Sequence, residues 1–415
     1  MPRIIYTLLL FLALPFVPLK LFWRGIKQPE YWQHWGERFG VYSTPVSKPV
    51  IWLHCVSVGE TRAAAPLVDA LQKEYPDYQI LLTHTTPTGR EVSEHLYGDS
   101  LQRVYLPYDL PYAVNKFLAH FNPAIGLLME TELWFNLIAA CKCKNVPLLL
   151  LNARLSAKSA KGYICLGGLV KNGLQSLSAI AAQSDADAAR IQSLGAEEVH
   201  VVGNLKFDVK PPEDSLEKGL ALRKVLGLKR TVFLAASTRE GEEALILEAV
   251  KGLNILTVIV PRHPQRFDEV SVLIEKRNLK YIRRSNLNAN AKQHVPVVLG
   301  DSMGELYVYY AACDFAYIGG SLLKFGGQNL IEAASMGKPV LIGPHTFNFA
   351  DASKSAIRSG AAILIKDVSE LREKIQELHQ NTKLREKMRK AALDYSKAST
   401  GASDRMMQLI KMYLN

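Results

Sequence analysis

The chain has 415 residues, of which 48% are hydrophobic and 21% are charged. This length and composition suit two domains that each bury a core, and they exclude a disordered or low-complexity polypeptide. An excess of 50 Lys and Arg over 39 Asp and Glu gives a net charge of +11, which predicts an anionic partner: nucleic acid, a membrane surface or a phosphorylated substrate. The five cysteines, an odd number, exclude a disulfide framework and favour a reducing compartment.

The N-terminus carries a run of 16 residues without charge, residues 4–19. As a helix it would be about 24 Å long, short of the roughly 30 Å hydrocarbon core of a bilayer. Basic residues mostly follow the run (Lys20, Arg24 and Lys27), and no cleavage site of small residues is present, which argues against a signal peptide. We therefore predict that residues 1–25 are an uncleaved anchor that spans the bilayer or dips into one leaflet, with the rest of the chain in the cytoplasm.

Residues 133–184 contain no Asp or Glu but six basic side chains. These are Lys142, Lys144, Arg154, Lys158, Lys161 and Lys171. Modules that bind nucleic acid usually interleave such charges with exposed aromatic residues, whereas Tyr163 is the one aromatic residue between the first and the last of the six. The window is therefore either a solvated basic face or a surface for lipid phosphates.

After residue 48, short apolar segments alternate with helical ones, which predicts parallel sheets covered on both faces. In the first half we expect strands at 50–56, 79–84, 103–106, 124–129, 147–151, 179–182 and 199–202. In the second half we expect them at 231–235, 256–260, 280–283, 296–299, 315–318, 339–342 and 361–364. The pattern breaks around Pro211 and Pro212, which indicates a hinge.

The predicted fold is α/β, with two doubly wound, Rossmann-like domains. We expect the N-terminal domain at 26–208, the second domain at 209–398 and a C-terminal helix at 399–415. Two such domains joined by a hinge would form an interdomain cleft at the carboxyl ends of both sheets, so functional residues should follow strands.

In the first half, Glu60 follows the first strand and lies near a helix N-terminus, whose field favours the ionised carboxylate. It is a candidate proton acceptor or, with no chemistry, a helix-start acid. Glu130 and Glu132 follow another buried strand and would project to the same side, unless they cap the next helix. Lys206 lies near the hinge, where it could face the cleft or be an ordinary surface lysine.

The second half carries candidate phosphate-binding features. Arg262 and His263 follow one strand, and the segment Gly300–Glu305 leads from another strand into a helix whose free N–H groups would bind an anion. Glycine pairs at 319–320 and 326–327 would let the backbone approach a ligand closely, and Glu332, expected one turn into the next helix, could accept hydrogen bonds from ribose hydroxyls.

Two apparent metal motifs carry no function in this interpretation. Asp185 and Asp187 have the spacing of a divalent-metal motif, but they follow Ser184 at an expected helix start, where acids are favoured. Cys141 and Cys143 lack a second Cys or His pair at zinc spacing. We predict no metal site.

Taken together, several motifs make the whole sequence resemble the Kdo transferases, the 3-deoxy-D-manno-octulosonate glycosyltransferases of lipopolysaccharide synthesis. The motifs are WGERFG (35–40), SVGE (57–60), METELW (129–134), GNLKFD (203–208), PRHP (261–264), GGS (319–321), GGQN (326–329) and GPHTFNF (343–349). Departures from the family pattern are Phe135, Gln328 and Leu330, where the family usually has Pro or His; they put side-chain contacts at Gln328 in doubt.

The resemblance implies the two-domain GT-B fold and inverting transfer of Kdo from CMP-Kdo to the lipid A precursor (lipid IVA), at the cytoplasmic face of the bacterial inner membrane. It implies Glu60 as the base, which deprotonates an acceptor hydroxyl, and Glu130 and Lys206 as stabilisers of the transition state. The residues that match CMP contacts are Arg262, His263, Met303, Gly304, Glu305, Asn329, Leu330, Ile331 and Glu332.

We further expect Arg154, Lys158 and Lys161 to face the phosphates of the acceptor or the anionic membrane surface. No cofactor, catalytic metal, nucleic acid or obligate protein partner is expected. The alternative functions are another GT-B enzyme that uses a UDP-sugar, and a membrane-associated binding protein with a degenerate nucleotide fold. Competition between CMP and UDP, and transfer from CMP-Kdo, would distinguish them.

Overall fold

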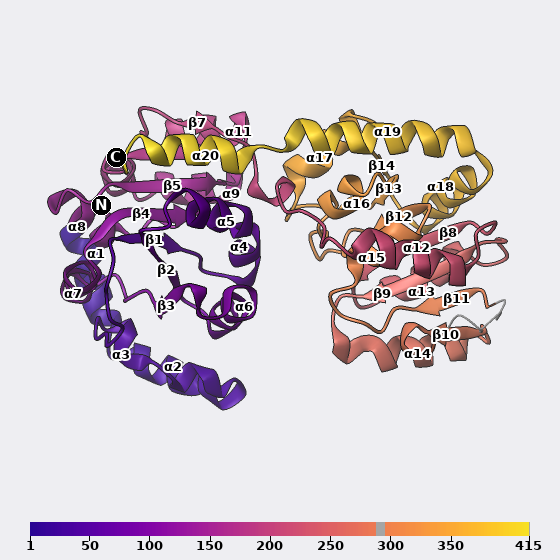
Figure 1. Ribbon diagram of the computed structural model, residues 1–415, viewed down its shortest axis with the longest axis horizontal. Helices are drawn as coiled ribbons and strands as arrows, with labels where there is room; N and C mark the ends of the chain where they lie inside the picture. Colours follow the sequence, from indigo (N-terminus) through magenta and orange to yellow (C-terminus); the bar gives the residue numbers. More distant parts are fainter. Residues whose placement is uncertain (288–294, 415) are drawn as a thin grey trace. The chain divides into compact units, whose positions relative to one another are not determined.

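The computed structural model describes residues 1–287 and 295–414 and divides into two compact units (Figure 1). Unit 1 consists of Met1–Val209 together with Thr400–Asn415, and unit 2 of Lys210–Ser399. The last residue of the predicted C-terminal helix, Asn415, lies outside the described residues.

Unit 1 is built on a parallel sheet. Its strands are β1 (Val50–His54), β2 (Gln79–His84), β3 (Gln102–Tyr105), β4 (Pro123–Met129), β5 (Leu148–Ala153), β6 (Ala179–Ala182) and β7 (His200–Val201). Among the described residues, these seven strands lie in the order β3-β2-β1-β4-β5-β6-β7.

The helices of unit 1 connect and cover these strands. They are α1 (Arg3–Ala13), α2 (Phe16–Lys27), α3 (Trp35–Arg38), α4 (Val58–Ala63), α5 (Ala65–Glu74), α6 (Pro87–Tyr97), α7 (Pro111–Phe121), α8 (Phe135–Cys143), α9 (Ala157–Ile164), α10 (Gly168–Leu174), α11 (Asp185–Ser193) and α20 (Ala402–Lys411). Short 3-10 helices are η1 (Pro29–Trp32), η2 (Gly98–Ser100) and η3 (Leu205–Phe207).

Both faces of the unit 1 sheet are buried, which explains why its strands are apolar at nearly every position. Along β1, Val50 and Trp52 enter one core, which also contains residues of α7 and α8. Ile51 and Leu53 enter the core on the other face, with residues of α5 and of α20 from the far end of the chain.

Unit 2 has the same architecture. Its strands are β8 (Val232–Thr238), β9 (Leu256–Pro261), β10 (Tyr281–Arg283), β11 (Val297–Leu299), β12 (Phe315–Ile318), β13 (Val340–Ile342) and β14 (Ala362–Leu364). Within the described part of the unit, these seven strands are parallel, in the order β10-β11-β9-β8-β12-β13-β14.

The helices of unit 2 follow the same alternation. They are α12 (Ser215–Leu226), α13 (Glu242–Ala249), α14 (Phe267–Lys276), α15 (Leu306–Ala312), α16 (Ile331–Ser335), α17 (Ala350–Arg358), α18 (Val368–Gln380) and α19 (Thr382–Ser399), with 3-10 helices η4 (Pro264–Arg266) and η5 (Arg284–Asn286). The prediction of two doubly wound α/β domains is confirmed, and each expected strand has its counterpart, with β8 running three residues further than expected.

Each sheet has a point where the chain reverses its direction of progress. In unit 1 the chain runs from β1 to β2 and β3 on one side, and then to β4 and the remaining strands on the other. In unit 2 the corresponding neighbours are β8 and β12. In doubly wound folds, ligands bind at the carboxyl ends of the two strands that flank this switch point.

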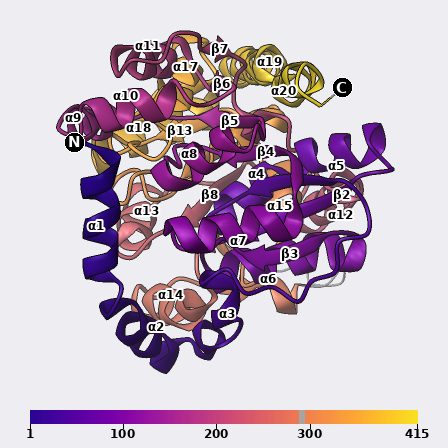
Figure 2. The ribbon, with the colours of Figure 1, turned by 90° about the vertical axis from the view of Figure 1, so that its left-hand side faces the viewer.

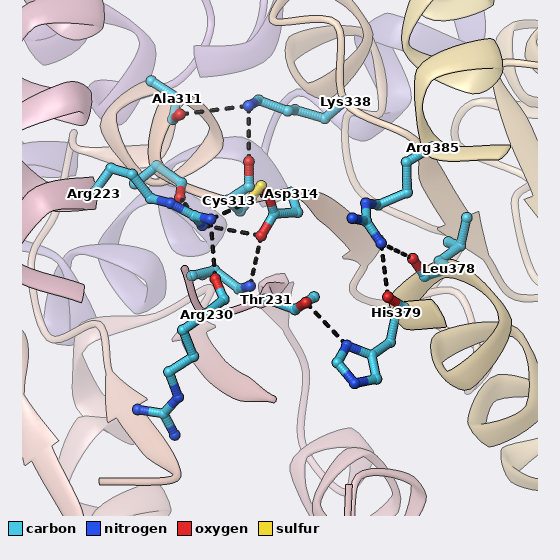
Figure 3. Close-up of polar contacts among 12 residues, drawn as sticks. Arg223, Arg230, Thr231, Ala311, Cys313, Asp314, Lys338, Leu378, His379 and Arg385 are labelled. Carbon is cyan, nitrogen blue, oxygen red and sulfur yellow. Dashed lines mark hydrogen bonds and ion pairs between the residues drawn. The ribbon is translucent and has the colours of Figure 1, made fainter. Parts of the chain in front are cut away.

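The opposite, amino-terminal edge of the unit 2 sheet is held by a polar network (Figure 3). Asp314, just before β12, accepts hydrogen bonds from the Val232 backbone N–H at 2.7 Å and from Arg223 at 3.0 Å. Lys338, just before β13, donates to the Cys313 carbonyl at 2.8 Å. These contacts join the first residues of neighbouring strands and so stabilise the amino-terminal edge of the sheet. The carboxyl edge remains for ligands.

The N-terminal helices α1 and α2, at the left and lower left of Figure 2, carry exposed apolar side chains. Ile4 and Leu12 on α1 are 73% and 71% exposed, and Trp23 on α2 is 80% exposed. Polar side chains of α1 bind unit 1: the Tyr6 hydroxyl donates to Asp109 at 2.8 Å. In the part of the chain that the structure describes, no single helix is long and apolar enough to cross a membrane, whereas α1 and α2 meet that criterion as a pair bent by 54°.

Candidate active site

Glu60 lies at the carboxyl end of β1, in the first turn of α4. Ser57 caps this helix by accepting a hydrogen bond from the Glu60 backbone N–H. The Glu60 carboxylate in turn accepts hydrogen bonds from the Val56 backbone N–H at 2.8 Å and from the Ser57 hydroxyl at 2.7 Å. This reciprocal arrangement resembles a capping box, with the N–H of Val56 in place of that of the N-cap residue, and it fixes the orientation of the carboxylate at the switch point of the sheet.

The sequence-based expectation that the helix field keeps Glu60 readily ionised is only part of its electrostatics. Burial raises the pKa of Glu60, the hydrogen bonds from Ser57 and Val56 lower it, and the negative charge of Glu130 raises it again. Burial has the largest effect, because Glu60 is only 8% exposed and α4 is only six residues long. The net result is a raised pKa. A raised pKa makes the carboxylate a stronger base once it is ionised.

Glu130 and Lys206 meet at the carboxyl end of β4. The Lys206 Nζ atom lies 3.9 Å from the Glu130 Oε1 atom. Glu130 has a φ of +58°, a left-handed backbone conformation that residues other than glycine rarely adopt. This turn is tied at Thr131, whose hydroxyl donates to the Arg154 carbonyl. Lys206 comes from η3, so residues 76 positions apart in sequence meet at one edge of the sheet.

Glu132 belongs to the same edge. Its Oε2 atom accepts a hydrogen bond from the Trp134 indole N–H at 2.9 Å. Burial and the charge of Glu60 raise the pKa of Glu132 to about 7. The sequence singled out Glu132 only as a partner of Glu130, and the structure adds its electrostatic link to Glu60 across the neighbouring strands β1 and β4.

The three basic residues expected to face phosphates lie on or just before α9, in unit 1. Lys158 and Lys161 are exposed on the helix, and Arg154 is half-buried at the end of β5. Burial raises the pKa of Tyr163, on the same helix, and the negative charge of Glu132 raises it further. The basic helix therefore neighbours the carboxylates of the switch point.

In unit 2, Arg262 and His263 follow β9 and are exposed. The pKa of His263 is lowered, first by partial burial and then by the positive charges of Arg239, Arg262 and Arg266. Arg266 is neutralised by buried Glu243, with a distance of 3.1 Å from its Nη2 atom to Oε2. The edge thus presents two guanidinium groups, of Arg239 and Arg262, that have no carboxylate within ion-pair distance among the described residues.

The segment from Met303 to Glu305 forms the turn before α15. Met303 is 55% exposed, Gly304 has a φ of +79°, and Glu305 pairs with Arg284 at 3.1 Å. As expected, residues 300–305 lead from β11 into a helix, since α15 begins at Leu306, and this helix has only seven residues. Its helix field at the glycine is correspondingly weak.

The second glycine pair leads into α16, which begins at Ile331. Glu332 is therefore in its first turn rather than one turn in, and its Oε1 atom accepts a hydrogen bond from Asn329 at 3.1 Å. Leu330 and Ile331 are buried, so they can offer a ligand only backbone atoms. Gly327 has a φ of +77°, which suits glycine.

The apparent metal motif at Asp185 and Asp187 is the start of α11, as expected. Ser184 caps this helix by accepting from the Asp187 backbone N–H at 3.2 Å, and the Asp187 carboxylate binds Arg190 at 3.0 Å. Among residues 1–287 and 295–414, no group of three or more His, Cys, Asp or Glu side chains could hold a metal ion.

Comparison with known proteins identifies the family. Residues 33–209 match the family model described as 3-deoxy-D-manno-octulosonic-acid transferase (kdotransferase), and residues 244–394 match glycosyl transferases group 1. A 3-deoxy-D-manno-octulosonic acid transferase of Bordetella pertussis is 41% identical over the whole length of both chains. This chain belongs to the Kdo transferase family.

Two further similarities agree with this. The 3-deoxy-D-manno-octulosonic acid transferase of Haemophilus influenzae is 37% identical over 99% of both chains. A glycosyltransferase of Rickettsia africae has a crystal structure that covers 89% of this chain and 99% of its own, with a TM-score of 0.60 and 15% identity. The chain is thus a glycosyltransferase of the Kdo transferase family, with the GT-B fold that the resemblance predicted.

Sequence reasoning missed two residues of this Kdo transferase at the unit 2 switch point. Arg239 directly follows β8, and its guanidinium lies over the Phe325 ring, 4.7 Å from the centroid. Glu242 is fully buried and accepts hydrogen bonds from the Gly320 backbone N–H at 2.6 Å and the Tyr317 hydroxyl at 2.6 Å. The strand was expected to end at Ala235, which hid the polar residues after it; the run Ser-Thr-Arg at 237–239 was the available signal.

Proposed function

We propose that this chain transfers Kdo from CMP-Kdo to the lipid A precursor lipid IVA, with Glu60 as the general base. Membership of the Kdo transferase family supports the donor and the reaction class. The observation that carries the assignment of the base is the oriented, buried carboxylate of Glu60 at the unit 1 switch point. Burial makes it a stronger base than an exposed glutamate.

In the proposed step, Glu60 takes the proton of an acceptor hydroxyl while the hydroxyl oxygen attacks the anomeric carbon of Kdo. The bond from that carbon to the phosphate oxygen breaks, its electron pair leaves with CMP, and the configuration inverts. Glu130 and Lys206, paired at 3.9 Å, would stabilise charge that develops in the transition state. The proton ends on Glu60, and the negative charge ends on the CMP phosphate.

Unit 2 would bind the donor. Arg262, with Arg239, supplies guanidinium groups for the phosphate, and His263 stands beside them. Asn329 and Glu332, joined at 3.1 Å, offer an amide and a carboxylate for the hydroxyls of the nucleotide. Because these guanidinium groups already supply positive charge, we expect transfer to need no metal ion or other cofactor.

We also propose that the enzyme works at the cytoplasmic face of the bacterial inner membrane. The exposed apolar side chains of α1 and α2, such as Leu12 and Trp23, would enter the lipid. Hydrogen bonds from Tyr6 to Asp109 and from Thr7 to Asn136 hold the polar side of α1 on unit 1, which favours a helix that dips into one leaflet over one that spans the bilayer.

The replacement Glu60→Gln tests the base. The amide keeps the volume of the side chain but cannot accept the proton, so the rate of Kdo transfer should fall by about 10²–10⁴-fold. The affinity for CMP, measured by calorimetry, should not change, because the proposed CMP contacts are on unit 2. Glu198→Gln, at a side chain that is 81% exposed, is the matched control. Near-normal turnover of the Glu60 variant would remove it as the base.

Competition between nucleotides tests the donor. If the donor is CMP-Kdo, CMP should displace it more strongly than UDP does. Stronger displacement by UDP would favour the alternative of another GT-B enzyme that uses a UDP-sugar.

A further inference from the structure

The proposed mechanism leaves one partly buried carboxyl group of the unit 1 switch point, that of Glu132, without a role. Glu132 lies two residues beyond Glu130, in the loop between β4 and α8. It is held by the Trp134 indole N–H at 2.9 Å, so its orientation is set by the loop. When ionised, Glu132 interacts electrostatically with the proposed base, Glu60.

The arrangement brings three carboxyl groups to one edge. Leu53 and His54 at the end of β1 pair with Leu127 and Leu128 near the end of β4, so the segments that follow these strands begin side by side. The charges of Glu60 and Glu130 both raise the pKa of Glu132, and the charge of Glu130 also raises the pKa of Glu60. Against them stands Lys206, whose ion pair is with Glu130.

The groups that face Glu132 come from each neighbouring element. They are Glu60 on α4, Glu130 and Trp134 in its own loop, and Tyr163 on α9, with Lys206 on η3 beyond Glu130. Burial raises the pKa of Glu132 to about 7, the charge of Glu60 raises it too, and the Trp134 hydrogen bond lowers it. Glu132 therefore changes its charge near neutral pH, whereas an ordinary glutamate does so near pH 4.5.

We propose that Glu132 is a positioning residue that acts through Glu60, and that its ionisation sets the basicity of the catalytic carboxylate. This rests on the proposed role of Glu60 as the base. When Glu132 loses its proton, a second negative charge stands beside Glu60 and favours uptake of the acceptor proton by Glu60. The two groups titrate as a coupled pair, so the rate of transfer should rise as pH passes through the second step of that pair.

The test is the pH dependence of kcat between pH 5 and 9, with CMP-Kdo and lipid IVA both saturating. The wild-type enzyme should show a rise centred near pH 7, of roughly threefold if Glu60 gains about one unit of basicity and its proton is half transferred in the transition state. Glu132→Gln should lack this rise, because the amide cannot ionise. It keeps an oxygen that can accept the Trp134 hydrogen bond, so the loop should stay folded.

A second variant separates this role from a structural one. Trp134→Phe keeps an aromatic ring but removes the N–H that stabilises ionised Glu132, so the rise should move to higher pH. Glu198→Gln, which removes an exposed charge of the same unit, should leave the wild-type profile unchanged.

Two results would overturn the proposal: a rise at the wild-type midpoint in Glu132→Gln, or an unshifted midpoint in Trp134→Phe. Its failure would be distinct from failure of the proposed function. If Glu60→Gln abolishes transfer while Glu132→Gln keeps the wild-type pH profile, then Glu60 remains the general base and Glu132 does not set its basicity.

Discussion

Removing the carboxylate of Glu242 should destabilise unit 2 and loosen the glycine loop after β12. Glu242 is fully buried, and its two oxygens accept four hydrogen bonds. Oε2 accepts from the backbone N–H groups of Gly320 at 2.6 Å and Arg239 at 2.9 Å. Oε1 accepts from the Tyr317 hydroxyl at 2.6 Å and the Leu322 N–H at 3.1 Å. The side chain thus joins the segments that follow β8 and β12.

The cost of Glu242→Ala can be worked from these contacts. The Leu322 N–H keeps an acceptor, since the Tyr317 hydroxyl oxygen lies 3.0 Å away. The N–H groups of Gly320 and Arg239 lose theirs, whereas the Tyr317 hydroxyl can turn to the Ser321 Oγ atom, 3.3 Å away. At about 1–3 kcal/mol for each buried donor left unpaired, the free energy of unfolding should fall by roughly 4 kcal/mol. Glu242→Gln keeps one acceptor oxygen and should cost about half as much.

Urea unfolding of the full chain, followed by hydrogen exchange in peptides from each unit, would measure this loss separately for unit 2. Glu240→Ala is the matched control, because Glu240 is exposed and only two residues away. Calorimetry should also show weaker CMP binding by Glu242→Ala, since the backbone of Gly320 would no longer be held. Equal unfolding midpoints for the Glu242 and Glu240 variants would refute the reasoning.

Two other measurements test unit 1. Reversing the charges of Arg154, Lys158 and Lys161 together should raise the KM for the lipid acceptor and weaken binding to anionic liposomes; if both are unchanged, these residues do not face phosphates. Glu132 should keep its proton up to about pH 7 in the native state, whereas an ordinary glutamate loses it near pH 4.5. The raised pKa therefore stabilises the folded protein fully below pH 4.5, and this stabilisation is lost as pH rises through 7. Glu132→Gln should remove this pH dependence. Between pH 4.5 and pH 8, the free energy of unfolding of the variant, measured in urea, should therefore increase by up to roughly 3 kcal/mol relative to that of the wild type. If the free energies of unfolding of the two proteins change in parallel with pH, the pKa of Glu132 is not raised.

The sequence by itself determined the two sheets and the places where chemistry should be sought. Continuous apolar segments alternating with helical ones specify buried parallel strands, because both faces of such strands must meet helices. Local signals also located Glu60 after β1 and Asp187 at a helix start, since capping depends on residues three positions apart. The family motifs, read along the whole chain, indicated the Kdo transferase family that the comparisons then showed.

Only the tertiary structure decided how those residues act on one another. The raised pKa of Glu60 and the coupling of Glu132 to it follow from burial and from the pairing of β1 with β4, strands about 70 residues apart. In unit 2, the buried contact of Glu242 with Gly320 joins segments that follow β8 and β12. Such contacts depend on which strands become neighbours at the switch point, and hydrophobic periodicity along the chain carries no information about strand order.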